Sequence, residues 1–271
     1  MSEIVIKAGR QSIQFFLRDL YNYRELLWIL ARKDIKVRYV QTFLGFLWAI
    51  INPLITVLIL SFVFGKVAKV ETGSIPHIVY TIAGLCGWAY FSEVVTSAGN
   101  SLLQAQHLIK KIYFPRLIIP LSKAIVALVD LVVLLIILCI MMVVYRVSPG
   151  SHIVYLPIFI LIAILSGLTG GIWISALSIR FRDFQYIIPI VLRLGMFLTP
   201  IAYSYSTVPE KYSLLFYLNP MAGVVEGFRW SLIGTEPPDT YFLLSYFMIF
   251  VFFILGIFYF KHVERTIADY I

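Results

Sequence analysis

Charged residues are scarce in this chain of 271 residues. Asp, Glu, Lys and Arg make up 13% of it, against about 25% in ordinary soluble domains. Hydrophobic residues make up 61%, and the mean hydropathy is +0.91. These proportions exclude a soluble enzyme, a disordered chain and a nucleic-acid-binding domain, and they indicate an integral membrane protein with several spans.

The patterns that mark catalytic and metal-binding sites are missing as well. The only Gly-Lys pair, Gly65-Lys66, has Leu60 where a phosphate-binding loop requires its first glycine. The four histidines are scattered, and Cys86 and Cys139 both lie in apolar runs, so neither a metal site nor a disulfide framework is expected. The sequence therefore predicts no catalytic residue, no metal and no cofactor in this chain.

Six apolar stretches are long enough to cross a membrane as helices, at about 20 residues each. Of the Lys and Arg residues outside these stretches, fifteen fall on the side of the termini and five on the other side. Since cytoplasmic segments carry the excess of Lys and Arg, both termini are expected in the cytoplasm. The predicted fold is an all-α integral membrane protein with six transmembrane helices, at 43–64, 75–95, 117–145, 153–179, 184–203 and 241–260.

The N-terminal segment 1–42 is predicted to be a cytoplasmic region that precedes a membrane domain at 43–271. Its apolar residues recur at helical spacing between Ile13 and Tyr39, with charged residues between them. Such an amphipathic helix is expected to lie in the headgroup plane, with its basic side chains toward anionic lipid. Two roles stay open: a plain membrane anchor, or a surface that receives force from a cytoplasmic partner.

The cytoplasmic segment 96–116 is too polar to span a membrane and too long for a tight connection. It is predicted to form a short amphipathic helix ended by Pro115. The alternative is a solvated connector with flanking topogenic charge.

On the outer side, segment 204–240 contains two short apolar pieces that predict a re-entrant helical hairpin before the last span. Between the pieces, Asn219 is a suitable N-cap and Pro220 a suitable first helical residue. Glu226 and Arg229 are three residues apart, so they are expected to pair on one helix face.

Four charged residues fall inside the predicted spans, where charge is costly. Glu93 and Lys123 lie near span ends. Lys123 and Asp130 are seven residues apart and share a helix face. Asp130 is expected to pair with Arg193 on another helix, either as a structural pair or in the wall of a water-filled pathway.

Aromatic residues make up 16% of the chain. Most are expected to be lipid-facing bulk or part of an interfacial belt. Some instead are candidates to line a pathway and to stack on sugar rings. These candidates are Phe43, Trp48, Trp88, Tyr90, Phe197 and Tyr203.

Five segments in order carry a resemblance to a known family. They are RKDIKVRYVQTFLGFLWAIINPL at 32–54, LIKKIYFPRLIIPL at 108–121, FRD at 181–183, LTPIAYSYSTVP at 198–209 and LNPMAGVVEGFRWSLIG at 218–234. The chain resembles the membrane subunit of type 2 ABC transporters, in the branch that exports O-antigen, capsule and teichoic-acid polymers. The resemblance covers nearly the whole chain, and the last segment is its most specific part.

The resemblance implies a homodimer in the bacterial inner membrane, assembled with two copies of a separate ATPase that binds ATP and Mg. The channel would form between the two copies, lined by spans one and five and closed outside by the hairpins. The expected cargo is a polysaccharide on a polyprenyl diphosphate lipid, and no nucleic acid is involved.

The resemblance also implies roles for individual residues. The expected ATPase contacts are Arg32, Lys33, Gln106, His107, Lys110 and Lys111. The expected contacts of the diphosphate headgroup are Arg38, Lys111, Arg180 and Arg182, and Arg193 joins the channel candidates. The outer hairpin is represented by Asn219, Pro220, Glu226 and Arg229.

Three alternatives stay open. A permease of the same superfamily for a drug or small lipid would match the 218–234 segment less well. A membrane-embedded glycosyl- or acyltransferase would need clustered Asp, Glu or His near one interface, and a channel would need a selectivity filter. The sequence contains neither feature.

Overall fold

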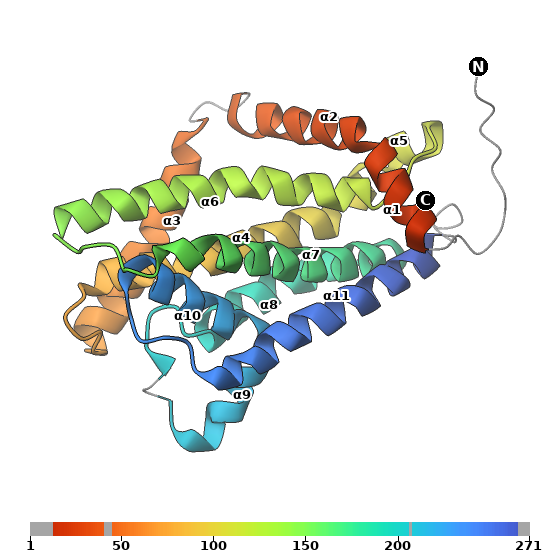
Figure 1. Ribbon diagram of the computed structural model, residues 1–271. Coiled ribbons are helices and arrows are strands. Elements are labelled where there is room, and N and C mark those ends of the chain that lie inside the picture. The colour runs from red at the N-terminus through yellow and green to blue at the C-terminus, as the bar shows by residue number, and fades with distance from the viewer. Residues whose placement is uncertain (1–12, 41–44, 206–207, 265–271) are drawn as a thin grey trace.

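Four long helices run side by side and form the body of the protein (Figure 1). The computed structural model describes residues 13–40, 45–205 and 208–264, and within these ranges the chain is helical with no strands. The four are α4 (His77–Gln104), α6 (Ile118–Val144), α7 (Leu156–Arg180) and α11 (Leu243–Glu264). The all-α prediction is confirmed.

Two further helices lie at the side of this body. α3 (Leu47–Leu60) continues into the π-helical segment η2 (Ser61–Val67), and together they form a fifth helix long and apolar enough to cross a membrane. α8 (Phe184–Leu198) is apolar but has only 15 residues. The predicted span 184–203 was too long, because Thr199 is extended (φ −97°, ψ 137°), as residues before a proline tend to be.

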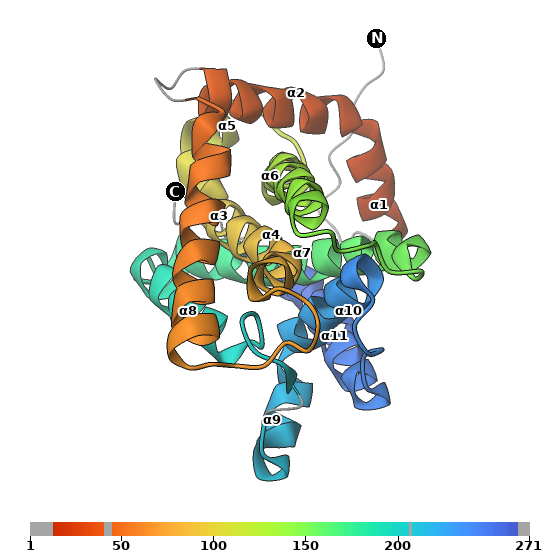
Figure 2. The same cartoon turned by 90° about the vertical axis from the view of Figure 1, so that its left-hand side faces the viewer.

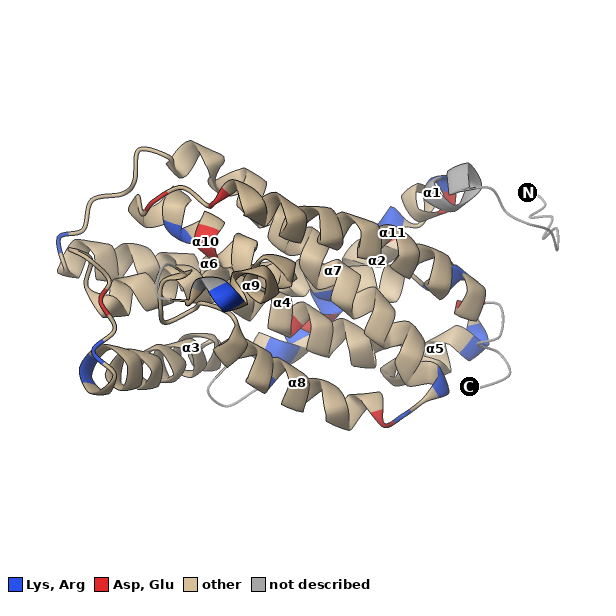
Figure 3. Cartoon of the chain, turned by 90° about the horizontal axis from the view of Figure 1, so that it is seen from below, with Lys and Arg blue, Asp and Glu red and all other residues tan. Residues whose placement is uncertain are grey.

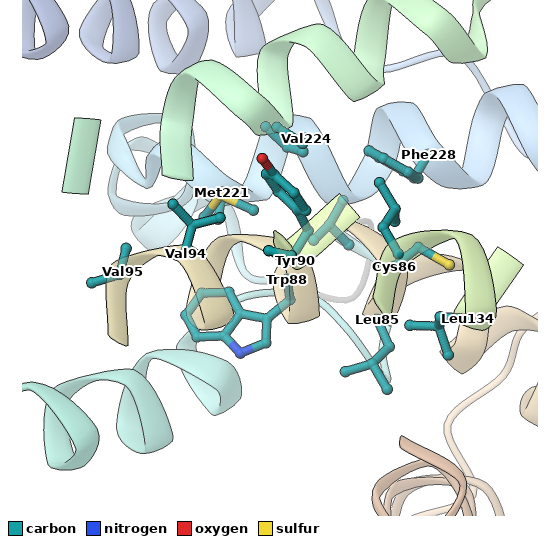
Figure 4. Packing of buried hydrophobic residues seen from close by; sticks show 14 of the residues in the cluster. Leu85, Cys86, Trp88, Tyr90, Val94, Val95, Leu134, Met221, Val224 and Phe228 are labelled. Atoms are coloured by element: carbon teal, nitrogen blue, oxygen red, sulfur yellow. The ribbon is translucent and has the colours of Figure 1, made fainter. Parts of the chain in front are cut away.

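The core is centred on α4, against which α6, α7 and α10 (Pro220–Ile233) pack (Figures 1 and 4). α7 approaches closely because it presents glycines to α4. A methyl group at Gly170 would lie 2.5 Å from a Val95 carbon, and one at Gly171 would lie 2.8 Å from Ala98. Small residues of this kind let membrane helices pack without a layer of side chains between them.

The N-terminal segment is folded onto this body rather than separate from it. It contains α1 (Ile13–Asn22), α2 (Arg24–Ile35) and the π-helical η1 (Lys36–Val40), with a turn at Tyr23 where one continuous helix was expected. α2 packs along α6 (Figures 1 and 2) and buries Ala31 completely.

Segment 96–116 is more helical than expected, because α4 extends to Gln104 before α5 (Gln106–Lys111) begins. At the opposite end of the body, α9 (Ser213–Leu218) and α10 form the predicted pair of short helices. Asn219 caps α10 as predicted: its side chain accepts a hydrogen bond from the Met221 backbone N–H at 3.0 Å. α10 is buried between α4, α7 and α11.

The structure also describes three short 3-10 segments: η3 (Ile153–Tyr155), η5 (Glu210–Tyr212) and η6 (Thr240–Phe242).

Candidate functional site

A cluster of opposite charges fastens the N-terminal segment to the helical body. Arg38 lies between two carboxylates, with Nη1 2.6 Å from Glu93 Oε1 on α4 and Nη2 3.0 Å from Asp130 Oδ2 on α6. The neighbouring Tyr39 donates a hydrogen bond from its hydroxyl to Asp130 Oδ1 at 2.6 Å. Burial, and after it the bond to Asp130, raises the pKa of the Tyr39 hydroxyl, so this group stays a donor.

A second ion pair lies beside the first. Lys123 Nζ on α6 is 2.8 Å from Asp34 Oδ2 at the end of α2. Lys123 and Asp130 therefore share a face of α6, as predicted, and that face receives the N-terminal segment. We call the six residues Asp34, Arg38, Tyr39, Glu93, Lys123 and Asp130 the N-terminal clamp.

The clamp corrects the expected pairing of Asp130 with Arg193. Asp130 binds Arg38, whereas Arg193 is exposed on α8. The same ion pairs occupy Arg38, which was expected to contact a diphosphate headgroup. The sequence predicted these faces in part. Asp34 and Arg38 are four residues apart, and Lys123 and Asp130 are seven apart, so in a helix each pair places both signs of charge on one face.

Four of the six expected ATPase contacts lie on α5, which stands at one end of the body (Figure 1). His107, Lys110 and Lys111 are exposed and Gln106 is half-buried. α5 borders a pocket of ≈ 220 Å³ whose lining includes Lys110, Lys111 and Arg116. The Arg116 backbone N–H donates to Glu264 Oε1 at 2.9 Å, and its guanidinium donates to the Glu264 carbonyl, which ties this loop to the end of α11.

The other basic residues expected on the cytoplasmic side are also exposed. Arg32 and Lys33 lie on α2, while Arg180 and Arg182 lie where α7 ends and α8 begins. The Arg180 guanidinium stacks over the Phe181 ring at 5.3 Å. Figure 3 shows Lys and Arg gathered toward the ends of the body, with a mixed group of both signs near α4.

The channel candidates divide into two groups. Trp48 on α3 and Phe197 on α8 are 47% and 50% exposed, and Tyr203 is half-buried, with its hydroxyl donating to the Phe197 carbonyl at 3.1 Å. Trp88 and Tyr90 are buried in the core around α4 (Figure 4). Phe43 lies outside the described residues.

Trp88 and Tyr90 therefore face neighbouring helices of this chain rather than a path. Trp88 packs on Gly195 of α8 and on Phe91, whose ring centroid is 5.5 Å away. The Tyr90 hydroxyl donates to the Ala124 carbonyl of α6 at 3.1 Å. An aromatic residue on a central helix fills the core, which composition alone does not reveal.

α3 and α8 are the loosely covered helices. Within the most apolar window of α3 and η2, 11% of the residues are buried, against 72% for α4. Arg193 is exposed, and it lies within α8 rather than at one of its ends. A charge facing hydrocarbon is costly, so this side of the chain is unsuited to lipid alone.

At the opposite end, Arg229 of α10 is fully buried and holds several groups together. Its Nη1 is 3.0 Å from Glu226 Oε1, which confirms the predicted pair. The guanidinium also donates to the carbonyls of Ile201 (2.5 Å) and Tyr203 (3.3 Å) and lies 3.9 Å above the Tyr80 ring. Arg229 thus fixes the segment after α8 against α4 and α10.

The chain is similar in sequence to known proteins. The family model described as "ABC-2 type transporter" matches residues 25–233. An O-antigen export system permease protein of Myxococcus xanthus is 29% identical over 82% of this chain and 86% of its own length. One of Klebsiella pneumoniae is 28% identical over 90% and 94%. A polysialic acid transport protein of Escherichia coli is 25% identical over 72% and 76%.

Proposed function

Because the chain belongs to the ABC-2 type transporter family, we propose that it is the multi-pass membrane subunit of a bacterial exporter that moves a lipid-linked polysaccharide across the inner membrane. As a member of this family it is a transport subunit rather than an enzyme, it carries no cofactor, and it works with a partner ATPase. The observation that carries the cargo is the similarity to O-antigen export permeases over 90% of the chain.

The polymer path runs between two copies of this chain, along α3 and α8. Two features support this proposal: these helices are poorly covered within one copy, and α8 exposes Arg193. A water-filled path gives that charge the solvation that lipid denies it. The exposed Trp48 and Phe197, together with Tyr203, supply flat rings along the path, and α9 and α10 close it on the outer side.

The partner ATPase binds the α5 end. Gln106, His107, Lys110 and Lys111 form the contact with α5, and Arg32 and Lys33 extend it to α2. Both termini lie on this cytoplasmic side. Because the N-terminal clamp joins α2 and η1 to α4 and α6, a movement of the ATPase that displaces α2 is passed to the body of the membrane subunit.

The diphosphate headgroup of the cargo is bound by Lys111, Arg180 and Arg182, which are exposed on the same side. Arg38 is not part of this set, since Glu93 and Asp130 occupy it.

Measuring polysaccharide export in a bacterial strain that lacks this chain tests the proposed function. Reintroducing the wild-type gene restores polysaccharide on the cell surface, whereas Arg193→Leu lowers it several-fold and lipid-linked polymer accumulates inside. Arg193→Lys, which keeps the charge, is the matched control and exports normally. If the strain that lacks the chain keeps its surface polysaccharide and has an altered lipid profile, the result would instead favour a permease for a small lipid.

The ATPase contact is tested by copurification. Lys110→Glu with Lys111→Glu places two negative charges on α5 and lowers the yield of bound ATPase about tenfold. Lys66→Glu with Lys69→Glu makes the same charge change at the opposite end and leaves that yield unchanged. Equal recovery of ATPase by both variants would remove α5 from the contact.

A further inference from the structure

A large open pocket lies at the end of the body opposite α5. Its volume is ≈ 780 Å³, within the range of about 300–1,000 Å³ typical of small-molecule sites. Three connecting segments form its walls: 71–75 after η2, 204–205 after α8, and 234–239 after α10. Two of these walls belong to the outer hairpin predicted from the sequence, for which no ligand was expected.

The pocket is acidic. Its lining contains Glu71, Glu226, Glu236 and Asp239, and none of the described lining residues is Lys or Arg. The segments predicted to face outward contain only one other acidic residue, Glu210. Two of the four carboxylates are engaged by the fold, since Glu226 pairs with Arg229 and Asp239 caps η6. Glu71 and Glu236 are exposed on different walls.

Uncharged hydrogen-bonding groups accompany these carboxylates. The lining includes the hydroxyl-bearing residues Thr72, Ser74, Ser204 and Thr235. Thr235 Oγ1 is buried and has no hydrogen-bond partner within the described part of the chain. This oxygen is closed to solvent, so it takes no part in what the open pocket binds. Ile75, Tyr80 and Phe242 add an apolar surface to the same pocket.

This chemistry selects among ligands. The described acidic residues do not come together in a group that could hold a metal ion. Arg229 balances the charge of Glu226, but no cation of the described lining balances Glu71, Glu236 and Asp239, so these three carboxylates repel phosphate, sulfate and carboxylate groups. Carboxylates only accept hydrogen bonds, so they suit a ligand that presents many O–H or N–H donors on an apolar ring. A sugar has this combination.

We propose that this outer pocket binds a sugar unit of the exported polymer, and that the unit is neutral or carries an amino group. The inference rests on the proposed function, and it deepens it by naming the class of glycan. Glu71 and Glu236, which are exposed on different walls, accept hydrogen bonds from opposite sides of the sugar. Polyanionic glycans are excluded from the pocket.

Binding to the purified complex of this chain and its ATPase in lipid nanodiscs tests the proposal. The probes are a glucose hexamer, a glucosamine hexamer and a sialic acid hexamer. The expected result is binding of the glucose or the glucosamine hexamer and none of the sialic acid hexamer. Glu71→Gln with Glu236→Gln weakens that binding about tenfold, because two charged acceptors are lost. Glu210→Gln removes one charge at the same end and leaves binding unchanged.

Several results would overturn the pocket assignment: tighter binding of the sialic acid hexamer, no binding of any hexamer, or equal binding by the double variant. Oligolysine as the only binder would assign the pocket to a cationic peptide instead. Export in cells separates this inference from the function itself. If the wild-type chain fails to restore export, the proposed function is wrong; if it succeeds and the double variant binds and exports equally well, only the pocket inference is wrong.

Discussion

At the scale of single residues, Asn219 joins three parts of the chain. Its side-chain oxygen caps α10 by accepting from the Met221 N–H. Its side-chain nitrogen donates to Thr199 Oγ1 at 3.0 Å, just after α8. Its backbone carbonyl accepts from the Ser245 hydroxyl of α11 at 3.0 Å. One polar side chain therefore positions the start of α10 relative to the end of α8.

Two substitutions of Asn219 distinguish the contribution of the cap from that of the hydrogen bond to Thr199. Asn219→Ala loses both and is expected to destabilise the protein by about 1–2 kcal/mol, the usual cost of losing a cap. Asn219→Asp keeps the acceptor and loses only the donor, so it retains most of the stability. Thermal unfolding of the purified variants in detergent measures the difference. An equal loss of stability in both variants would mean that the bond to Thr199, rather than the cap, provides the stabilisation.

Residues that act through neighbours in sequence were predictable, and those that act across the fold were not. The Asn219 cap and the Glu226–Arg229 pair join residues two or three positions apart. Arg38 and Glu93 are 55 positions apart, so their pairing depends on how α4 packs. The carbonyls that Arg229 binds gave no sequence signal, because every residue has one.

At the scale of elements, apolar length predicted where the long helices lie but not where they end. α4 continues to Gln104, beyond the apolar run that predicted it, whereas α8 stops at Leu198 before Pro200. The docking of α2 on α6 was also unpredicted. Amphipathic spacing is the same whether a helix lies on lipid or on protein.

Exchanging the charges of one clamp pair tests this docking. Asp34→Lys and Lys123→Asp each place like charges 2.8 Å apart in the wild-type geometry, so each lowers the unfolding temperature and export. The double variant restores an ion pair of reversed polarity and recovers part of the loss, with a coupling energy of about 1 kcal/mol. Losses that simply add in the double variant would mean that α2 is held by other contacts.

At the scale of the whole molecule, the uneven distribution of Lys and Arg predicts which end faces the cytoplasm. Lys66 and Lys110 are exposed at opposite ends of the body. In a background without Cys86 and Cys139, Lys66→Cys is expected to react in intact cells with a thiol reagent that does not cross membranes. Lys110→Cys is expected to react only after the cells are permeabilised. The reverse pattern would invert the orientation.

The helix formed by α3 and η2 connects the N-terminal clamp to the outer pocket. Its 21 residues make a rod about 30 Å long. The chain before the rod passes through the N-terminal clamp, and the chain after it forms the Glu71 wall of the outer pocket. Few of its residues are buried within one copy, so a tilt imposed at one end is passed along the helix, less any bending at Pro53. A movement of this helix therefore displaces the Glu71 wall, which links the proposed sugar pocket to the N-terminal clamp.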